Sequence, residues 1–211
     1  MDNGKTELLR FDKNGTLLGR FSLPEETKHG FNDLVVLRDG DVFVTDTAGN
    51  QVYHFDPGKK GFQALTLNRG MFEPNGIAVS DDQEFLFIAD QLGVLRYEIK
   101  TGHSAEVLPG AGSTLAGADG LYWYKGSLVA IQNGIGSPRI AAFQLSNDGL
   151  RVKKTTILEN RSLFTTLPTT GAIRGDKFYF IVNSQLDNLN GDRILDATTL
   201  APVRIGVLTL P

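Results

Sequence analysis

Asn75-Gly76-Ile77-Ala78-Val79 is one of four segments that open with a polar residue and continue as a short apolar strand. The other three are Asn32-Asp33-Leu34-Val35-Val36, Asp119-Gly120-Leu121-Tyr122-Trp123 and Thr170-Gly171-Ala172-Ile173. Their first residues are 43, 44 and 51 positions apart in chain order. A period near this length, built from short strands, is typical of the blades of a β-propeller. The sequence therefore predicts an all-β propeller in which the polar residue that opens each blade faces the central channel.

Each repeat divides into four short strands, A to D, separated by turn residues such as Asp39-Gly40 and Pro57-Gly58. Full blades are predicted over residues 31–67, 74–109, 118–159 and 169–210, and a half blade over residues 7–21. In the fourth blade, we place strand C at residues 194–196 and strand D at residues 203–208. No helix is needed to complete this plan.

An open array of four and a half blades would leave strand edges unprotected, which a propeller avoids by closing its ring. We therefore expect a six-bladed ring whose first one and a half blades lie outside this sequence. Residues 1–211 would then belong to a single domain. A five-bladed ring with a two-stranded first blade is the alternative.

Composition excludes several classes of function. The chain has 21 Lys and Arg against 24 Asp and Glu, so it lacks the basic excess that nucleic-acid binding requires. It has no cysteine, which excludes disulfides, Cys–Zn sites and thiol nucleophiles. No apolar run approaches the ~18 residues of a membrane span, and no signal peptide is visible. The sequence predicts a soluble protein, cytoplasmic or secreted, and leaves its oligomeric state open.

Oxygen-bearing side chains recur at two places in every repeat, and both places lie at the same end of the blade because strands A and B are antiparallel. The blade-opening set is Asn32, Asp33, Asn75, Asp119 and Thr170, and the set after strand B is Asp46, Asp90, Gln132, Asn133 and Asn183. We expect all ten to converge on one end of the channel. Ca²⁺ takes six to eight oxygen ligands in irregular geometry, so such a set favours Ca²⁺ over Zn²⁺.

Two blades also resemble those of the SMP-30/gluconolactonase/LRE-like family of six-bladed propellers. The resemblance covers residues 8–210, and Asp119-Gly120-Leu121 stands where that family has an acidic blade opening. Its motifs are Phe31-Asn32-Asp33-Leu34-Val35-Val36 with Asp39-Gly40-Asp41-Val42-Phe43-Val44-Thr45-Asp46, and Glu73-Pro74-Asn75-Gly76-Ile77-Ala78-Val79-Ser80 with Leu86-Phe87-Ile88-Ala89-Asp90.

The resemblance implies a divalent metal, usually Ca²⁺, at the channel mouth and hydrolysis of a lactone or related ester such as a sugar lactone. It implies that Asn75 and Asp119 are metal ligands, that Asn32 binds the metal directly or through water and substrate, and that Asp119 helps to activate water. It also implies that hydroxyls of a small polar substrate are recognised by Gln132, Asn133 and Asn183. The family's acidic ligand from its first blade, in a Glu-Gly-Pro-type motif, has no counterpart here.

The same residues also have simpler, purely structural interpretations. Asn and Asp open propeller blades for turn geometry alone, and Asp46 and Asp90 suit hydrogen bonds to backbone N–H groups at strand ends. His29 is a candidate general base because it lies three residues before Asn32. Two functions compete with the metal-dependent lactonase: a non-catalytic propeller that binds a small molecule, glycan or protein on its loops, as NHL-type repeats do, and a strictosidine-synthase-like propeller.

Overall fold

The computed structural model describes residues 5–24, 28–160, 166–191 and 193–211 and shows a series of twisted antiparallel sheets. The first blade contains β3 (Phe31–Val36), β4 (Val42–Asp46), β5 (Gln51–Asp56) and β6 (Gly61–Ala64). The second contains β7 (Ile77–Val79), β8 (Phe85–Ala89), β9 (Val94–Glu98) and β10 (Ser104–Glu106), and the third contains β11 (Ala118–Tyr124), β12 (Ser127–Gln132), β13 (Arg139–Leu145) and β14 (Val152–Asn160). The predicted A-to-D order of neighbouring strands is confirmed in these three sheets.

The fourth blade differs from the prediction, because its sheet has three strands: β15 (Gly171–Arg174), β16 (Lys177–Ile181) and β19 (Ile205–Thr209). Strand β19 pairs directly with β16, so the segment predicted as strand D occupies the position of strand C. The segment predicted as strand C lies elsewhere. Its Ile194 belongs to β18 (Arg193–Ile194), which pairs with β17 (Leu189–Asn190) in a separate hairpin. Two single-turn helices, Leu186–Asn188 and Ala197–Thr199, flank this hairpin.

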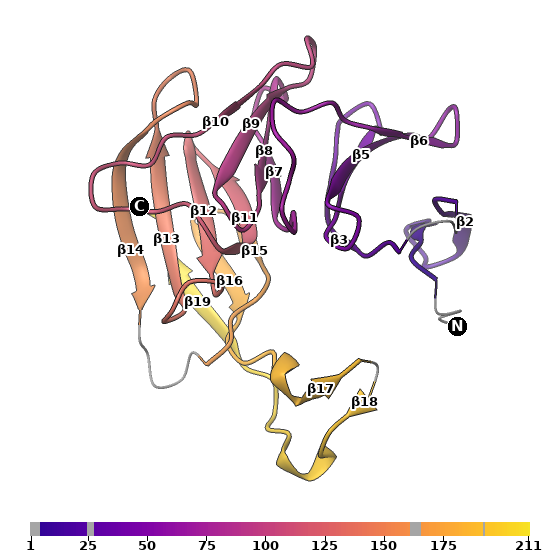
Figure 1. Cartoon of the computed structure of the whole chain (residues 1–211). Helices are drawn as coiled ribbons and strands as arrows, with labels where there is room; N and C mark the ends of the chain where they lie inside the picture. The colour runs from indigo at the N-terminus through magenta and orange to yellow at the C-terminus, as the bar shows by residue number, and fades with distance from the viewer. Residues whose placement is uncertain (1–4, 25–27, 161–165, 192) are drawn as a thin grey trace.

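At the N-terminal end, β1 (Leu8–Phe11) and β2 (Leu17–Phe21) form a two-stranded sheet of their own. Phe21 packs on Phe55 of the first blade, with ring centroids 4.6 Å apart. Figure 1 shows the sheets following one another in an arc, from this indigo pair to the orange and yellow fourth blade. No helix in the described part of the chain has the length and apolar character needed to cross a membrane.

The cores lie between successive blades, where the faces of two sheets meet. Side chains from blades one and two form one buried cluster, those from blades two and three a second, and those from blades three and four a third. The second strand of each blade is covered on both faces, and this explains why β4, β8 and β12 read as almost continuous apolar runs. Lys125 and Gly126, both with positive φ, make the tight turn from β11 to β12.

Candidate functional site

The side chains of Asn75 and Asp119 lie next to each other at the end of the channel where β7 and β11 begin, close enough for the Asn75 amide to lower the pKa of Asp119. Asn133, which follows β12, donates from Nδ2 to Asp119 Oδ2 at 2.5 Å. The blades approach closely enough for this because Gly76 lies against the backbone of the third blade. A Cβ at Gly76 would be 2.5 Å from Leu121 N and 2.6 Å from Asp119 O. The predicted convergence of Asn75, Asp119 and Asn133 is therefore present.

Asp33 supplies a second carboxylate to this end of the channel. The register of β3 against β4 shifts between Phe31 and Leu34, and the irregularity contains Asp33. Asp33 Oδ1 accepts from the N–H of Leu34 at 2.8 Å, and Oδ2 accepts from the N–H of Ile77, in the next blade, at 3.0 Å. Sequence reasoning placed Asp33 in the blade-opening set but named only its neighbour Asn32 as a metal residue.

The two carboxylates share an unusual electrostatic environment. Burial raises the pKa of Asp119, against the opposing effect of the hydrogen bond from Asn133 and of the nearby Asn75 amide. Burial also raises the pKa of Asp33, and the nearby charge of Asp119 raises it further. In both carboxyl groups the effect of burial exceeds that of the hydrogen bonds that favour the charged form.

The third and fourth blades are tied together beside the carboxylates by Tyr122 of β11. Its hydroxyl accepts from the N–H of Gly171 at 2.7 Å and lies 3.2 Å from Thr170 Oγ1. Burial, and to a lesser extent the charges of Asp33 and Asp119, raise the pKa of the Tyr122 hydroxyl. Tyr122 and Asp33 line an open pocket of about 420 Å³ that follows the inner strands to polar residues at the other end of the channel, Arg38 and Gln83 among them. Asn75, Asp119 and Asn133 do not line this pocket. Tyr122 of the third blade thus lies at the channel.

Asn32 lies on the exposed rim of this end, where its Nδ2 donates to Thr47 Oγ1 at 3.0 Å. His29, the candidate base, pairs through Nδ1 with Asp46 Oδ2 at 2.5 Å, and its ring packs edge-on to Tyr53. Its backbone oxygen also accepts from Thr6 Oγ1, in the N-terminal segment, at 2.9 Å.

Four of the residues after strand B are not brought into this cluster, which corrects the expectation that ten side chains converge. They are Asp46, Asp90, Gln132 and Asn183, all buried. In the first three blades they hold the loop that leads into their own blade's first strand: Asp46 accepts from Gly30 N, Asp90 from Phe72 N, and Gln132 donates to Thr114 O and Ala116 O.

Gln132 and Asn183, predicted to bind substrate, use their side chains within their own blades. Gln132 Oε1 also accepts from Arg139 Nε at 2.8 Å. Asn183 accepts from Arg204 N and donates to Pro202 O. Contact with a substrate would require these buried hydrogen bonds to break.

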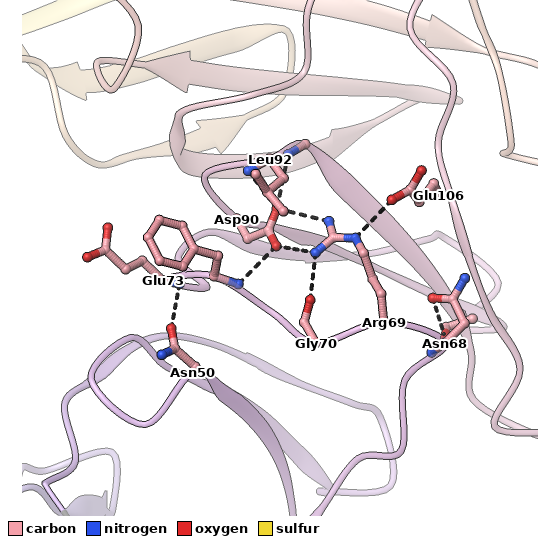
Figure 2. A network of polar contacts seen from close by, with 11 residues as sticks. Asn50, Asn68, Arg69, Gly70, Glu73, Asp90, Leu92 and Glu106 are labelled. Atoms are coloured by element: carbon pink, nitrogen blue, oxygen red, sulfur yellow. Dashed lines mark hydrogen bonds and ion pairs between the residues drawn. The ribbon is translucent and has the colours of Figure 1, made fainter.

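Arg69 is a residue that sequence reasoning missed, and Figure 2 shows it at the centre of the network that holds the loop before Asn75. Its guanidinium donates to both carboxylate oxygens of Asp90, at 2.5 and 3.0 Å, and its Nε donates to Glu106 at 2.9 Å. Asp90 also accepts from the N–H groups of Leu92 and Gly93. The hydrogen bonds to Asp90 raise the pKa of Arg69. The loop that presents Asn75 is thus held in place by the ion pair between Arg69 and the buried Asp90.

The cluster consists of two carboxylates and two amides, which are hard oxygen donors of the kind that Ca²⁺ binds. No group of three or more His, Cys, Asp or Glu side chains placed to hold a metal occurs among the residues that the structure describes. Any metal here would therefore depend on amide oxygens and on ligands from water or substrate.

Comparison with solved structures identifies the fold. The chain resembles virginiamycin B lyase from Staphylococcus aureus, with 16% identity and a TM-score of 0.61, over 84% of this chain and 57% of that one. It resembles a gluconolactonase from Xanthomonas campestris, with 17% identity and a TM-score of 0.61, over 96% of this chain and 65% of that one. It also resembles a chain in the nidogen–laminin complex, with 18% identity and a TM-score of 0.65, over 85% of this chain and 67% of that one.

At these identities the likeness shows a β-propeller and nothing finer. The chain spans only 57% of the length of the lyase. No family model and no curated protein matches the sequence.

Proposed function

We propose that this end of the channel binds a divalent cation, Ca²⁺, and that the protein hydrolyses a lactone or a related ester. The observation that supports the proposal most strongly is the contact between Asn75 and Asp119, which come from different blades and meet only because the sheets surround a common axis. The likeness to a gluconolactonase adds a precedent for this chemistry on a similar fold.

The donor set fits such an ion. Asp119 and Asn75 offer a carboxylate and an amide oxygen at one point, and Asp33 adds a negative charge nearby. The raised pKa values of both aspartates mean that their charged forms are poorly compensated by the protein alone, so a bound cation would stabilise them. Asn32 at the rim has an amide oxygen that reaches the ion directly or through water and substrate.

The chain's own residues have separate parts in this proposal. Asp119 would hold the ion and would accept the proton of the attacking water, while Asn133 orients the Asp119 carboxylate through its Nδ2. Asn75 completes the pair of ligands, and Asn32 positions the substrate at the rim. When bound, Ca²⁺ would polarise the lactone carbonyl and stabilise its developing negative charge.

The experiment is calorimetric titration with Ca²⁺ together with hydrolysis of glucono-δ-lactone and δ-valerolactone. Asp119→Ala is expected to abolish Ca²⁺ binding and turnover, and Asn75→Ala is expected to weaken both. Asp176→Ala is the matched control, because Asp176 is an exposed carboxylate in the turn at the opposite end of the fourth blade.

The outcomes separate the candidate functions. Absence of Ca²⁺ binding by the wild-type protein refutes the proposal. Ca²⁺ binding without turnover of either lactone points instead to a propeller that binds a ligand without catalysis.

A further inference from the structure

The fourth blade differs from the others in the connection between its second and third strands. In the first three blades this connection covers residues 47–50, 90–93 and 133–138. In the fourth it covers residues 182–204 and contains β17, β18 and both single-turn helices. Figure 1 shows this segment, which we call the arm, extending away from the sheets.

The arm is unusually apolar for a segment in water. Six of its described side chains are large, apolar and between 40% and 64% exposed. They are Leu186, Leu189, Ile194, Leu195, Leu200 and Val203. An exposed apolar group of this kind marks a surface that meets a ligand or another molecule.

The base of the arm is continuous with the candidate site. Asn133, which donates to Asp119, also donates to Pro168 O at 2.9 Å. The adjacent Leu167 O accepts from both the N–H and the hydroxyl of Ser184, at 3.1 and 3.0 Å. A short series of hydrogen bonds thus leads from the Asp119 carboxylate to the start of the arm.

The base is also held in a defined position. Gln185 exchanges two hydrogen bonds with Ala201, from Nε2 to Ala201 O at 2.9 Å and from Ala201 N to Oε1 at 2.7 Å. Asn183 bonds both Pro202 O and Arg204 N. These two side-chain clamps close the arm into a loop on the same end of the blade as Thr170 and the cluster. Five of the six apolar residues lie beyond the clamps, and Val203 lies at the base between Pro202 and Arg204.

We infer that the arm binds the apolar part of a substrate whose polar, hydrolysable end lies at Asp119. The substrate class is then a lactone or ester with an alkyl chain, rather than a sugar lactone. This inference rests on the proposed function and specifies the substrate of the same site. Binding energy from a remote apolar group improves catalysis when it helps to fix the reacting end.

A small amphipathic ligand accounts for the arm better than a second copy of the chain does. The hydrogen-bonded continuity with Asn133 and Asp119 places the base of the arm beside the site, so an alkyl chain attached to a bound lactone would extend from there along the arm.

The test compares δ-dodecalactone, which has an alkyl chain, with δ-valerolactone, which has none, in the presence of Ca²⁺. The variant carries Ile194→Ser and Leu195→Ser together, since both side chains are more than half exposed. We expect kcat/KM for the alkyl lactone to fall about tenfold and that for δ-valerolactone to stay unchanged. Leu92→Ser is the matched control, because Leu92 is an equally exposed leucine in the corresponding connection of the second blade. An equal loss for both lactones, or no loss for the alkyl lactone, overturns the inference.

A second measurement separates this inference from the proposed function. If the wild-type protein hydrolyses neither lactone, the proposed function fails, and saturation-transfer NMR of intact δ-dodecalactone still tests the arm. Alkyl proton signals that weaken in the double variant and not in Leu92→Ser support the inference, and equal signals overturn it. A wild-type dimer that dissociates in the double variant, seen by sedimentation velocity, also overturns it, because the arm would then be an interface between copies.

Discussion

Replacing Arg69 by glutamine removes the charge that compensates Asp90 beneath the loop before Asn75. Arg69 makes two hydrogen bonds to the Asp90 carboxylate, one to Glu106 and one to Gly70 O. The Asp90 side chain is fully buried, whereas the Arg69 side chain is 20% exposed. The substitution therefore leaves a buried carboxylate without its cation while the exposed partner Glu106 returns to solvent.

The magnitude follows from that burial. Removing one partner of a buried ion pair destabilises a protein by about 3–5 kcal/mol, because the remaining charge is uncompensated. Asp90 retains hydrogen bonds from the N–H groups of Phe72, Leu92 and Gly93, so we expect a loss near the lower limit, about 3 kcal/mol. For a domain of this size that loss lowers Tm by roughly 6–12 °C.

Urea unfolding followed by Trp123 fluorescence measures the change, and Arg38→Gln is the control. Arg38 is exposed at the other end of the channel, where its guanidinium donates to Asp81 O, and its loss is expected to cost at most about 1 kcal/mol. A loss for Arg69→Gln below about 1 kcal/mol, or equal to that of Arg38→Gln, would refute the assignment of Arg69 as the anchor of this loop.

Three further predictions concern the channel itself. Asp119→Asn is expected to be more stable than wild type at pH 7 in EDTA, because the pKa of Asp119 is raised in the folded protein and wild-type stability therefore falls as pH rises through that pKa. Measurements of Tm from pH 3 to 7 should show the difference vanishing below pH 3.8. Tyr122→Phe leaves the N–H of Gly171 without its acceptor and should destabilise the protein by about 1–3 kcal/mol in urea unfolding, while an unchanged midpoint would mean that water replaces the hydroxyl. Gly76→Ala forces a methyl against Leu121 N and should destabilise by about 1–3 kcal/mol and weaken Ca²⁺ binding in calorimetry; a variant as stable as wild type would contradict the close approach of the blades.

The sequence was sufficient to predict the propeller because two independent periodicities agree. Short apolar strands recur within each repeat, and the opening polar residue recurs between repeats. Together they place Asn75 and Asp119 at one end of a common channel, and the structure has them in contact. The contact of Asn133 with Asp119 follows from the same antiparallel geometry.

The residues after strand B could not be assigned correctly from that geometry alone. Topology gives the end of the blade at which Asp90 and Gln132 lie, but it does not say whether their side chains face the channel or the loops above the sheet. Loop backbone supplies many unsatisfied donors and acceptors, and both side chains bind there. A signal for Arg69 does exist: Arg69-Gly70 repeats the His29-Gly30 pair 40 residues earlier, and both basic residues bind the aspartate at the end of strand B.

The fourth blade was mispredicted because the arm contains its own short strands. Residues 194–196 have the composition of a strand and stand at the expected spacing, so periodicity assigns them to the blade. In the structure Ile194 pairs with Leu189 instead, within the hairpin. Strands β17 and β18 are close in sequence and pair with each other, whereas pairing of this segment with β16 would require a longer loop to close.

Gly76 and Gly120, which follow Asn75 and Asp119, tolerate substitution less well than the residues before them. At Gly76 and Gly120 an added methyl would collide with backbone of the next blade, so the spacing between neighbouring blades at the channel depends on the absence of a side chain. Asn75 and Asp119, immediately before these glycines, are partly buried, and Asp119 accepts a hydrogen bond from Asn133. Neither residue belongs to the buried apolar clusters between the blades. Exchange of the polar group at either position would therefore leave the apolar packing in place, whereas a side chain at either glycine would force the blades apart.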